Sequence, residues 1–287
     1  MELSTLMFAS IVLPTLAIFT NLIFAKQANL RDTITFAAAL ATFAVVVSIA
    51  LKLGNATTPK FVLFEVFPNI PIAFNVEPLG LLFGLVASGL WIVTHIYAIG
   101  YMRGNGESHH ARFFACFSGA IAAALGIAWS SNMFTLFLFY EILTISTYPL
   151  VVHKGTPEAI RGARTYLGIL LGTSIALQLT AVVWTYAVAN TLDFELGGIL
   201  RDSELPLALV PILLALYAFG IGKAALMPFH RWLPAAMVAP TPVSAPTPVT
   251  ARPTPVPAPT PVPALTPLLA PTPVPATTPV PAPTPVP

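Results

Sequence analysis

Long apolar stretches with few charges constrain this chain more than any other feature of its sequence. A membrane-spanning helix needs about 20 mostly apolar residues to cross about 30 Å of hydrocarbon. Of the 287 residues, 56% are hydrophobic and 8% are charged, whereas charged residues make up about a quarter of an ordinary soluble domain. We therefore predict an all-α polytopic membrane protein with about seven transmembrane helices. The predicted spans are 4–25, 33–53, 77–101, 112–130, 132–152, 160–189 and 205–226.

The first apolar stretch lies where a cleavable signal peptide would also lie. It lacks a basic segment before it and a small-residue cleavage site after it, so we interpret it as a membrane span. Lys and Arg concentrate in the cytoplasmic loops of membrane proteins. Their distribution here predicts a multi-pass protein of the bacterial inner membrane with its N-terminus outside. One side of the predicted topology receives Lys26, Arg31, Arg103, Arg112, Lys154, Arg161, Arg164 and Arg231, and the other receives Lys52, Lys60 and Arg201.

Two connections between spans have recognisable local patterns. The β-rich piece Lys60–Phe67 lies among prolines in the loop 55–76, which is too short and too interrupted to span a membrane. We predict a surface hairpin there. The connection Ser130–Asn132 is short enough to make the fourth and fifth spans antiparallel neighbours, and Asn132 is placed to act as an N-cap.

A Pro-rich segment follows Ala245 and differs in composition from everything before it. The pentapeptide Ala-Pro-Thr-Pro-Val recurs from Ala239 onward. Proline lacks a backbone N–H and fixes φ, so we expect polyproline II in place of helix or sheet. The segment is either a spacer or ligand for a proline-binding domain, or a low-complexity expansion without a partner. We divide the chain into a span pair with its hairpin loop (1–76), a membrane domain (77–245) and a tail (246–287).

Charge and cysteine content exclude several classes of protein. The net charge of +2 is too small for a nucleic-acid-binding surface. The single cysteine, Cys116, is interpreted as a packing residue, which leaves neither a disulfide nor a Cys-based metal site. His109 and His110 are adjacent, would diverge on a helix and lack a third ligand, so we predict a solvated loop and no metal site. No flavin, haem, nucleotide or quinone motif is present, and we expect no cofactor.

Two ionisable residues are predicted to lie deep inside apolar spans. Glu141 is in the fifth span and Lys223 in the seventh. A charge at membrane depth costs at least about 2.5–3.5 kcal/mol, so such groups face the bundle interior, pair with each other or lose their charge. A buried Glu–Lys pair that exchanges a proton can act as a relay. The same pair can also do no more than hold two helices together, and the residues alone leave both interpretations open.

Helix-breaking residues surround Lys223. Gly220 and Gly222 precede it, and Pro228 and Pro234 follow it. This pattern predicts an interrupted helix, which in transporters lines a wet cavity where ions bind. It does not fit a phosphate-binding loop, because no Ser or Thr follows the lysine.

Further polar residues flank these two candidates. His230 titrates near neutral pH, so it either hands protons to the pathway or anchors the chain at the membrane interface. Arg161 and Arg164, at the start of the sixth span, point either toward a proton uptake funnel or to solvent. Other polar side chains near Glu141 either hold water or satisfy helix packing. They are Tyr140, Thr144, Ser146, Thr147 and Tyr148.

Taken in order, five segments of the chain resemble the antiporter-like, proton-translocating subunits of NADH:quinone oxidoreductase (complex I), of Mrp-type sodium/proton antiporters and of membrane-bound hydrogenases. The resemblance implies that Glu141 and Lys223 form the central ion pair of a proton half-channel within 77–245. His230 matches a position that only some branches occupy with histidine. Paralogous membrane subunits in a lipid bilayer are the implied partners, and the chain itself is implied to carry no redox centre. The segments are Gly100-Tyr-Met-Arg-Gly104, Arg112-Phe-Phe114, Phe139-Tyr-Glu141, Gly222-Lys-Ala-Ala-Leu-Met-Pro228 and Trp232 to Ala245.

The chain departs from this family after Ala245. Family members continue with an eighth span and a second, inverted five-helix repeat, whereas here the Pro-rich tail begins. We therefore expect a truncated N-terminal half. Our leading hypothesis is a subunit that translocates protons, with sodium coupling left open, through Glu141 and Lys223. The alternative is a truncated, transport-inactive membrane protein that packs beside a partner complex. A small-solute carrier is the third hypothesis.

Overall fold

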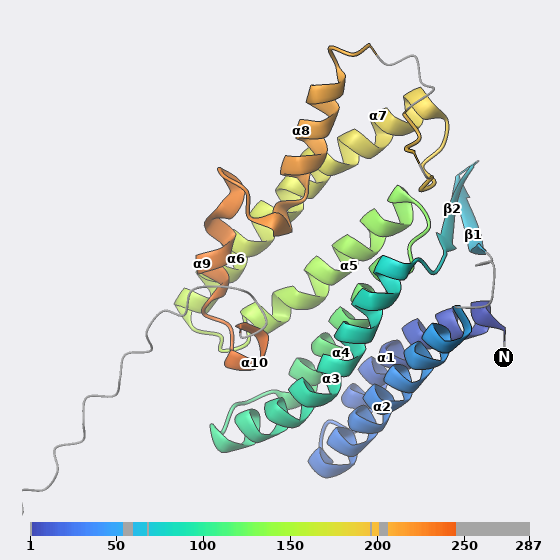
Figure 1. The fold of residues 1–287 in the computed structure, drawn as a ribbon. Helices are drawn as coiled ribbons and strands as arrows, with labels where there is room; N and C mark the ends of the chain where they lie inside the picture. Colours follow the sequence, from blue (N-terminus) through green and yellow to red (C-terminus); the bar gives the residue numbers. More distant parts are fainter. Residues whose placement is uncertain (1, 54–59, 68, 196, 201–205, 245–287) are drawn as a thin grey trace, which may run out of the picture. The chain divides into compact units, whose positions relative to one another are not determined.

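A computed structural model describes residues 2–53, 60–67, 69–195, 197–200 and 206–244 of the chain (Figure 1). The predicted Pro-rich tail, and with it the expected polyproline II, lies outside these described residues. The described elements all belong to one unit, Met1–Pro248.

Six apolar helical runs in the described part of the chain are long enough to cross a membrane. They confirm the predicted all-α membrane fold and the first six predicted spans. The sixth is a single run, Pro157–Ala189, whose middle is a π-helical segment, Ser174–Gln178. The helices are α1 Leu3–Ile23, α2 Ala28–Leu53, α3 Pro78–Gly104, α4 His110–Ala128, α5 Met133–Val151, α6 Pro157–Thr173 and α7 Leu179–Ala189.

The seventh predicted span is broken, as expected, and its helix is shorter than predicted. Helix α8 covers Val210–Gly220, which at about 1.5 Å per residue spans roughly half of the hydrocarbon thickness. After it come a single turn at Gly222–Ala224, another at Phe229–Arg231, and the short helices α9 Trp232–Ala236 and α10 Thr241–Ser244. The chain is thus interrupted on both sides of Lys223.

The predicted hairpin is present between α2 and α3, but one of its strands is not at the surface. Strands β1 Phe61–Phe67 and β2 Ile70–Phe74 pair antiparallel, and β2 buries Ile72, Ala73 and Phe74. The Ala73 amide donates to Thr135 Oγ1 at 3.1 Å, and the Ser131 amide donates to the Ala73 carbonyl at 3.0 Å. The hairpin is therefore bonded to the start of α5. We call this end of the helices the hairpin side, and the end with the α1–α2, α3–α4 and α5–α6 loops the loop side.

Asn132 is the N-cap of α5, as predicted. Its side-chain oxygen accepts from the Thr135 amide at 2.7 Å, and its side-chain nitrogen donates to the Pro71 carbonyl at 2.8 Å. One side chain therefore satisfies an unpaired amide of the helix and connects the helix to β2. Helices α4 and α5 pack against each other along their length, as the short connection between them predicts.

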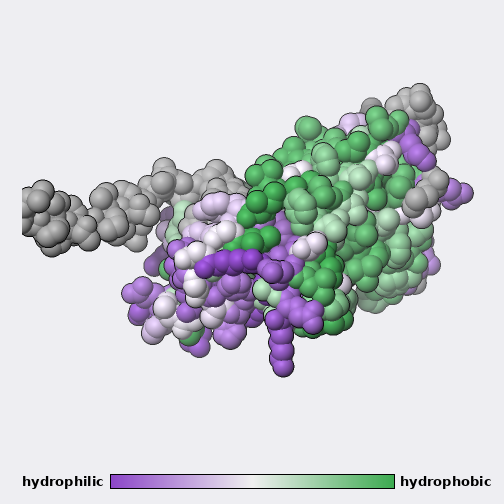
Figure 2. Space-filling model, turned by 90° about the horizontal axis from the view of Figure 1, so that it is seen from below, coloured by the Kyte–Doolittle hydropathy of each residue, from purple (hydrophilic) through white to green (hydrophobic). Residues whose placement is uncertain are grey.

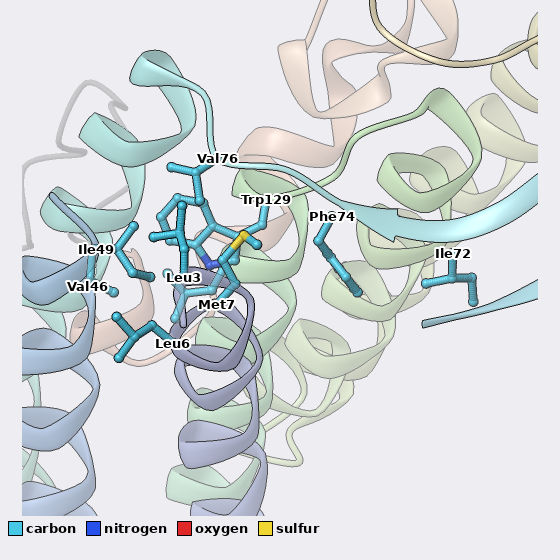
Figure 3. Packing of buried hydrophobic residues seen from close by; sticks show 10 residues of the cluster. Leu3, Leu6, Met7, Val46, Ile49, Ile72, Phe74, Val76 and Trp129 are labelled. Carbon is cyan, nitrogen blue, oxygen red and sulfur yellow. The ribbon is translucent and has the colours of Figure 1, made fainter. Parts of the chain in front are cut away.

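The main hydrophobic core lies on the hairpin side, where α1, α2 and α4 meet β2 and the chain leading into α3 (Figure 3). Trp129 is fully buried at its centre, and its indole N–H donates to Ser10 Oγ at 3.0 Å. Outside this core many large apolar side chains are exposed, among them Leu51 at 77% and Leu79 at 78%. Figure 2 shows apolar residues covering a broad face of the molecule. Such a surface is stable in lipid and not in water.

Candidate functional site

Helix α5 carries Glu141 in its middle, about two and a half turns from the Asn132 cap. Both carboxylate oxygens are buried and accept no hydrogen bond from the described residues. The hydroxyl of Ser174, in the π-helical segment, lies close by but donates to the Leu170 carbonyl at 2.8 Å. A buried carboxyl group with free acceptor positions either holds a proton or binds one readily from a neighbour.

Lys223 lies on the single turn that follows α8, and its side chain crosses to α5. Its ammonium nitrogen donates to the Tyr140 carbonyl at 2.9 Å and to Thr144 Oγ1 at 2.7 Å. The same nitrogen lies 3.4 Å from the centroid of the Tyr140 ring. The backbone amide of Lys223 donates to the Tyr140 hydroxyl at 3.0 Å. Neutral oxygens and an aromatic face thus hold the lysine on α5.

The two glycines before Lys223 allow the broken segment to approach the sixth span. A Cβ at Gly220 would lie 2.6 Å from the Gln178 backbone nitrogen, and one at Gly222 would lie 2.3 Å from Thr173 Oγ1. Any other residue would push the turn away. The Gly222 carbonyl accepts the Ala225 amide at 3.1 Å and also the Trp232 indole N–H at 2.8 Å. Gly220 and Gly222 therefore set the depth at which Lys223 enters the bundle.

Glu141 and Lys223 come to the same level of the bundle without forming the direct ion pair that the resemblance implies. No side-chain N···O contact within 4.0 Å joins them in the described structure, although each acts electrostatically on the other. The reason is geometric, since adjacent residues on a helix point about 100° apart. Lys223 binds the face of α5 that carries Tyr140 and Thr144, whereas Glu141 turns toward the π-helical segment.

The other predicted site residues lie toward the loop side. His230 is exposed on the turn Phe229–Arg231, and no hydrogen bond between described residues connects it to Lys223. Arg161 and Arg164 are exposed on α6. Thr147, by contrast, is joined to the buried Tyr166 by a 2.6 Å hydrogen bond. Among the polar residues near Glu141 on α5, Tyr140 and Thr144 are the ones that contact Lys223.

A cavity of about 310 Å³ lies next to Lys223, which forms part of its wall. Thr147 and Tyr166 add hydroxyl groups to this wall, and Val151 and Trp232 add apolar surface. Its remaining lining comes from the chain after Trp232, up to Val243. The cavity therefore leads from the lysine along α5 and α6 toward the loop side.

A second group of buried charges was missed by the sequence reasoning. Asp32 accepts from Arg31 at 2.7 Å and from Arg103 at 2.6 Å, and the side chains of Arg31 and Asp32 are 3% and 6% exposed. His95, inside the third span and 1% exposed, lies 3.2 Å from the Asp32 carbonyl. Arg31 and Arg103 were assigned to loops by their place in the sequence. His95 was detectable, because a histidine deep in an apolar span is itself a signal.

His153, in the α5–α6 loop, was also missed. Its side chain is 1% exposed, and Nε2 lies 4.0 Å from the Glu107 carboxylate. Neither ring nitrogen has a hydrogen-bond partner among the described residues. Burial and, to a smaller degree, the neighbouring Arg112 charge hold the pKa of His153 below its ordinary value of 6.5, against the opposing effect of Glu107. The group is therefore kept neutral in the folded chain near neutral pH.

We expect the free energy of unfolding to fall as the pH is lowered below 6.5, the ordinary pKa of histidine. The unfolded chain protonates His153 around that pH, whereas the folded chain does so only at lower pH, so acid favours the unfolded state. Between about pH 5 and pH 8, the free energy of unfolding should change less steeply with pH in His153→Gln than in wild type. The exposed His230→Gln variant is the matched control and should keep the wild-type slope. Equal slopes for His153→Gln and wild type would contradict this prediction.

Two protein-family models match the chain. The model described as "NADH:quinone oxidoreductase/Mrp antiporter, TM" matches residues 130–249, which include Glu141, Lys223 and His230. The model described as "NADH-Ubiquinone oxidoreductase (complex I), chain 5 N-terminus" matches residues 67–114. Together they cover the same part of the chain as the motifs.

Curated relatives agree with these models. A putative antiporter subunit of Staphylococcus haemolyticus is 32% identical over 199 residues, covering 67% of this chain and 24% of the relative. One subunit of the Na(+)/H(+) antiporter of Alkalihalophilus pseudofirmus is 30% identical, covering 61% and 22%. An NAD(P)H-quinone oxidoreductase subunit 5 from the chromatophore of Paulinella chromatophora is 33% identical, covering 61% and 28%. The chain spans about a quarter of the length of these relatives.

Two solved structures have a similar fold. A chain of the Mrp complex from Dietzia sp. is 25% identical with a TM-score of 0.62, covering 84% of this chain and 26% of that one. A chain of the archaeal membrane-bound sulfane sulfur reductase has a TM-score of 0.70 at 22% identity, covering 83% and 49%. The latter similarity concerns the fold alone.

Proposed function

We propose that this chain translocates protons as one subunit of a larger complex. The chain belongs to the family of antiporter-like membrane subunits of NADH:quinone oxidoreductases and Mrp antiporters. The observation that carries the proposal is the placement of Lys223 on a broken turn inside the bundle, bound to α5 at 2.9 and 2.7 Å, with the unpaired carboxyl of Glu141 at the same level. Paralogous membrane subunits are the proposed partners.

Lys223 is proposed as the group that carries the proton. The oxygens that accept from it, the Tyr140 carbonyl and the Thr144 hydroxyl, are uncharged, so they leave the ammonium free to release a proton without breaking an ion pair. The carboxyl of Glu141 is proposed to receive or return that proton, because neither of its oxygens is occupied by another hydrogen-bond donor among the described residues. A relay needs a partner that can exchange a proton with the lysine without forming a permanent ion pair with it.

Protons are proposed to arrive from the loop side through the cavity of about 310 Å³ beside Lys223. The hydroxyls of Thr147 and Tyr166, 2.6 Å apart, provide exchangeable protons along its wall. His230, exposed on the same broken segment, is placed to collect protons at the surface. We propose that this side faces the cytoplasm and that the N-terminus lies on the opposite side, because its loops carry an excess of Lys and Arg.

Glu141→Gln tests the proposal, because the amide keeps the shape of the side chain and cannot carry a proton. We expect proton flux in sealed vesicles containing the assembled complex to fall on the order of 10²-fold. Glu195→Gln, which changes an exposed glutamate on the hairpin side, is the matched control and should keep full flux. Full flux with Glu141→Gln in an assembled complex would favour the alternative, a membrane protein that packs beside its partners without transporting.

A further inference from the structure

A second cavity lies on the hairpin side of Lys223, between α5, α7 and α8. Its volume is about 200 Å³. Most of its wall is apolar, formed by Leu136, Val182 and Ile221 among others, but Gln178 and Tyr217 also line it. A buried water needs about 10–15 Å³ of such space and two to four polar partners. The cavity is large enough for several waters.

Gln178 has an unused acceptor in this cavity. Its side chain is 4% exposed, and its Oε1 accepts no hydrogen bond from the described residues. An unpaired buried amide oxygen destabilises the folded chain unless something donates to it. The side chain cannot simply withdraw, because the Gly220 end of α8 packs directly on the Gln178 backbone.

The Tyr217 hydroxyl also has free capacity. It lies 2.8 Å from Thr185 Oγ1 and 3.1 Å from Met133 Sδ. The Thr185 hydroxyl donates to the Ala181 carbonyl at 2.8 Å, so the tyrosine uses its single proton toward Thr185 or Met133. Its oxygen lone pairs remain available to a donor in the cavity.

The π-helical segment carries one polar side chain beside Glu141 and another that lines the cavity. Ser174 lies beside Glu141, and Gln178 follows four residues later on the same face of this segment, where it lines the cavity. A π-helical turn is commonly found at functional sites. Here it places two polar side chains in a row between the carboxyl group and the hairpin side.

We propose that Gln178 and Tyr217 hold ordered water in this cavity, and that this water conducts protons between Glu141 and the hairpin side. Gln178 is a positioning residue, since it anchors the water and neither gains nor loses a proton. Each water accepts one proton and passes another on, so charge moves while the side chains stay neutral. The conducting role rests on the proposed function; the presence of anchored water does not.

Hydroxyl-radical footprinting of the full chain in its native membrane tests the anchored water, because bound water is the local source of radicals. Met133 borders the cavity, whereas Met7 is 1% exposed in the main core and reports on a dry site. We expect Met133 to oxidise several-fold faster than Met7 in wild type, and Gln178→Leu to lower the Met133 rate at least about threefold. Gln27→Leu, which changes an exposed loop residue, should leave it unchanged. An equal Met133 rate in wild type and Gln178→Leu would overturn the proposal.

Proton flux then separates this inference from the proposed function. We expect Gln178→Leu to slow flux about tenfold with the complex assembled, and Tyr217→Phe, which removes one hydroxyl, to slow it in the same direction. If Glu141→Gln blocks flux and both of these variants keep the wild-type rate, the conducting path is overturned while the proposed function stands. If Gln178→Leu does not assemble, Tyr217→Phe carries both readouts: reduced Met133 oxidation and reduced flux support the proposal, and wild-type values overturn it.

Discussion

Replacing Lys223 with alanine is expected to abolish proton transport while the complex still assembles. The substitution removes the amine and its hydrogen bonds to the Tyr140 carbonyl and Thr144 Oγ1, and no other described residue places a titratable nitrogen against this face of α5. Assembly should persist, because the turn is held independently by the Trp232 indole, which donates to the Gly222 carbonyl at 2.8 Å. The measurement is proton flux in vesicles, with co-purification of partner subunits as the check on assembly.

Lys223→Arg separates a relay from a structural cation. Arginine keeps the positive charge and can donate to the same two oxygens, but it does not release its proton at any physiological pH. A relay predicts that flux in Lys223→Arg is as low as in Lys223→Ala. If the lysine only holds α8 and α5 together, Lys223→Arg should retain most of the wild-type flux. That result would contradict the proposed function.

Replacing Asp32 with alanine is expected to cause the largest loss of stability, about 3–5 kcal/mol in the free energy of unfolding. Asp32 neutralises Arg31 and Arg103 at 2.7 and 2.6 Å, and the Arg31 side chain is 3% exposed. Removing the carboxylate leaves the Arg31 guanidinium buried without a counter-charge. Denaturant unfolding of the membrane-embedded chain, followed by the fluorescence of its tryptophans, measures the change.

The matched control is Asp193→Ala, which breaks the ion pair with Lys60 at 2.5 Å. Its partners are 37% and 39% exposed, so water screens both charges, and the expected loss is below about 1 kcal/mol. Similar losses for the two variants would mean that the Arg31–Asp32–Arg103 cluster is hydrated in the membrane. The burial of Arg31 would then not determine the cost of removing Asp32.

Different residues are expected to determine the activity and the stability of this chain. The broken segment after α8 shows the physical reason. Its close contacts are made by Gly220 and Gly222 with the sixth span, and its charged group is held by hydrogen bonds and the Tyr140 ring, without a direct ion pair. The buried charges of Arg31 and Asp32 on α2 are, in contrast, paired directly, and the half-exposed Arg103 on α3 forms a second ion pair with Asp32. The group proposed to change its protonation state is therefore weakly paired, whereas the Arg31–Asp32–Arg103 cluster is held by direct ion pairs.

Local patterns in the sequence were sufficient to predict much of the fold. Apolar runs of about 20 residues identify membrane spans whatever their neighbours, because each helix satisfies its own backbone hydrogen bonds. The hairpin in the loop 55–76, the Asn132 cap and the break around Lys223 were also predicted from local patterns. Proline, glycine and capping residues act on the chain within a few positions of themselves. The family followed from motifs that are contiguous in the sequence.

What the sequence did not determine is which side chains meet across helices. Glu141 and Lys223 were identified as buried, but their partners depend on the rotation of α5, which places Tyr140 and Thr144 against the lysine and Glu141 toward Ser174. The pairing of Asp32 with Arg103, 71 residues apart, and the burial of His95 and His153 depend likewise on long-range packing. Spans can be read from the sequence because their hydrogen bonds are local. The contacts that tune a buried charge come from residues distant along the chain, and only the tertiary structure decides them.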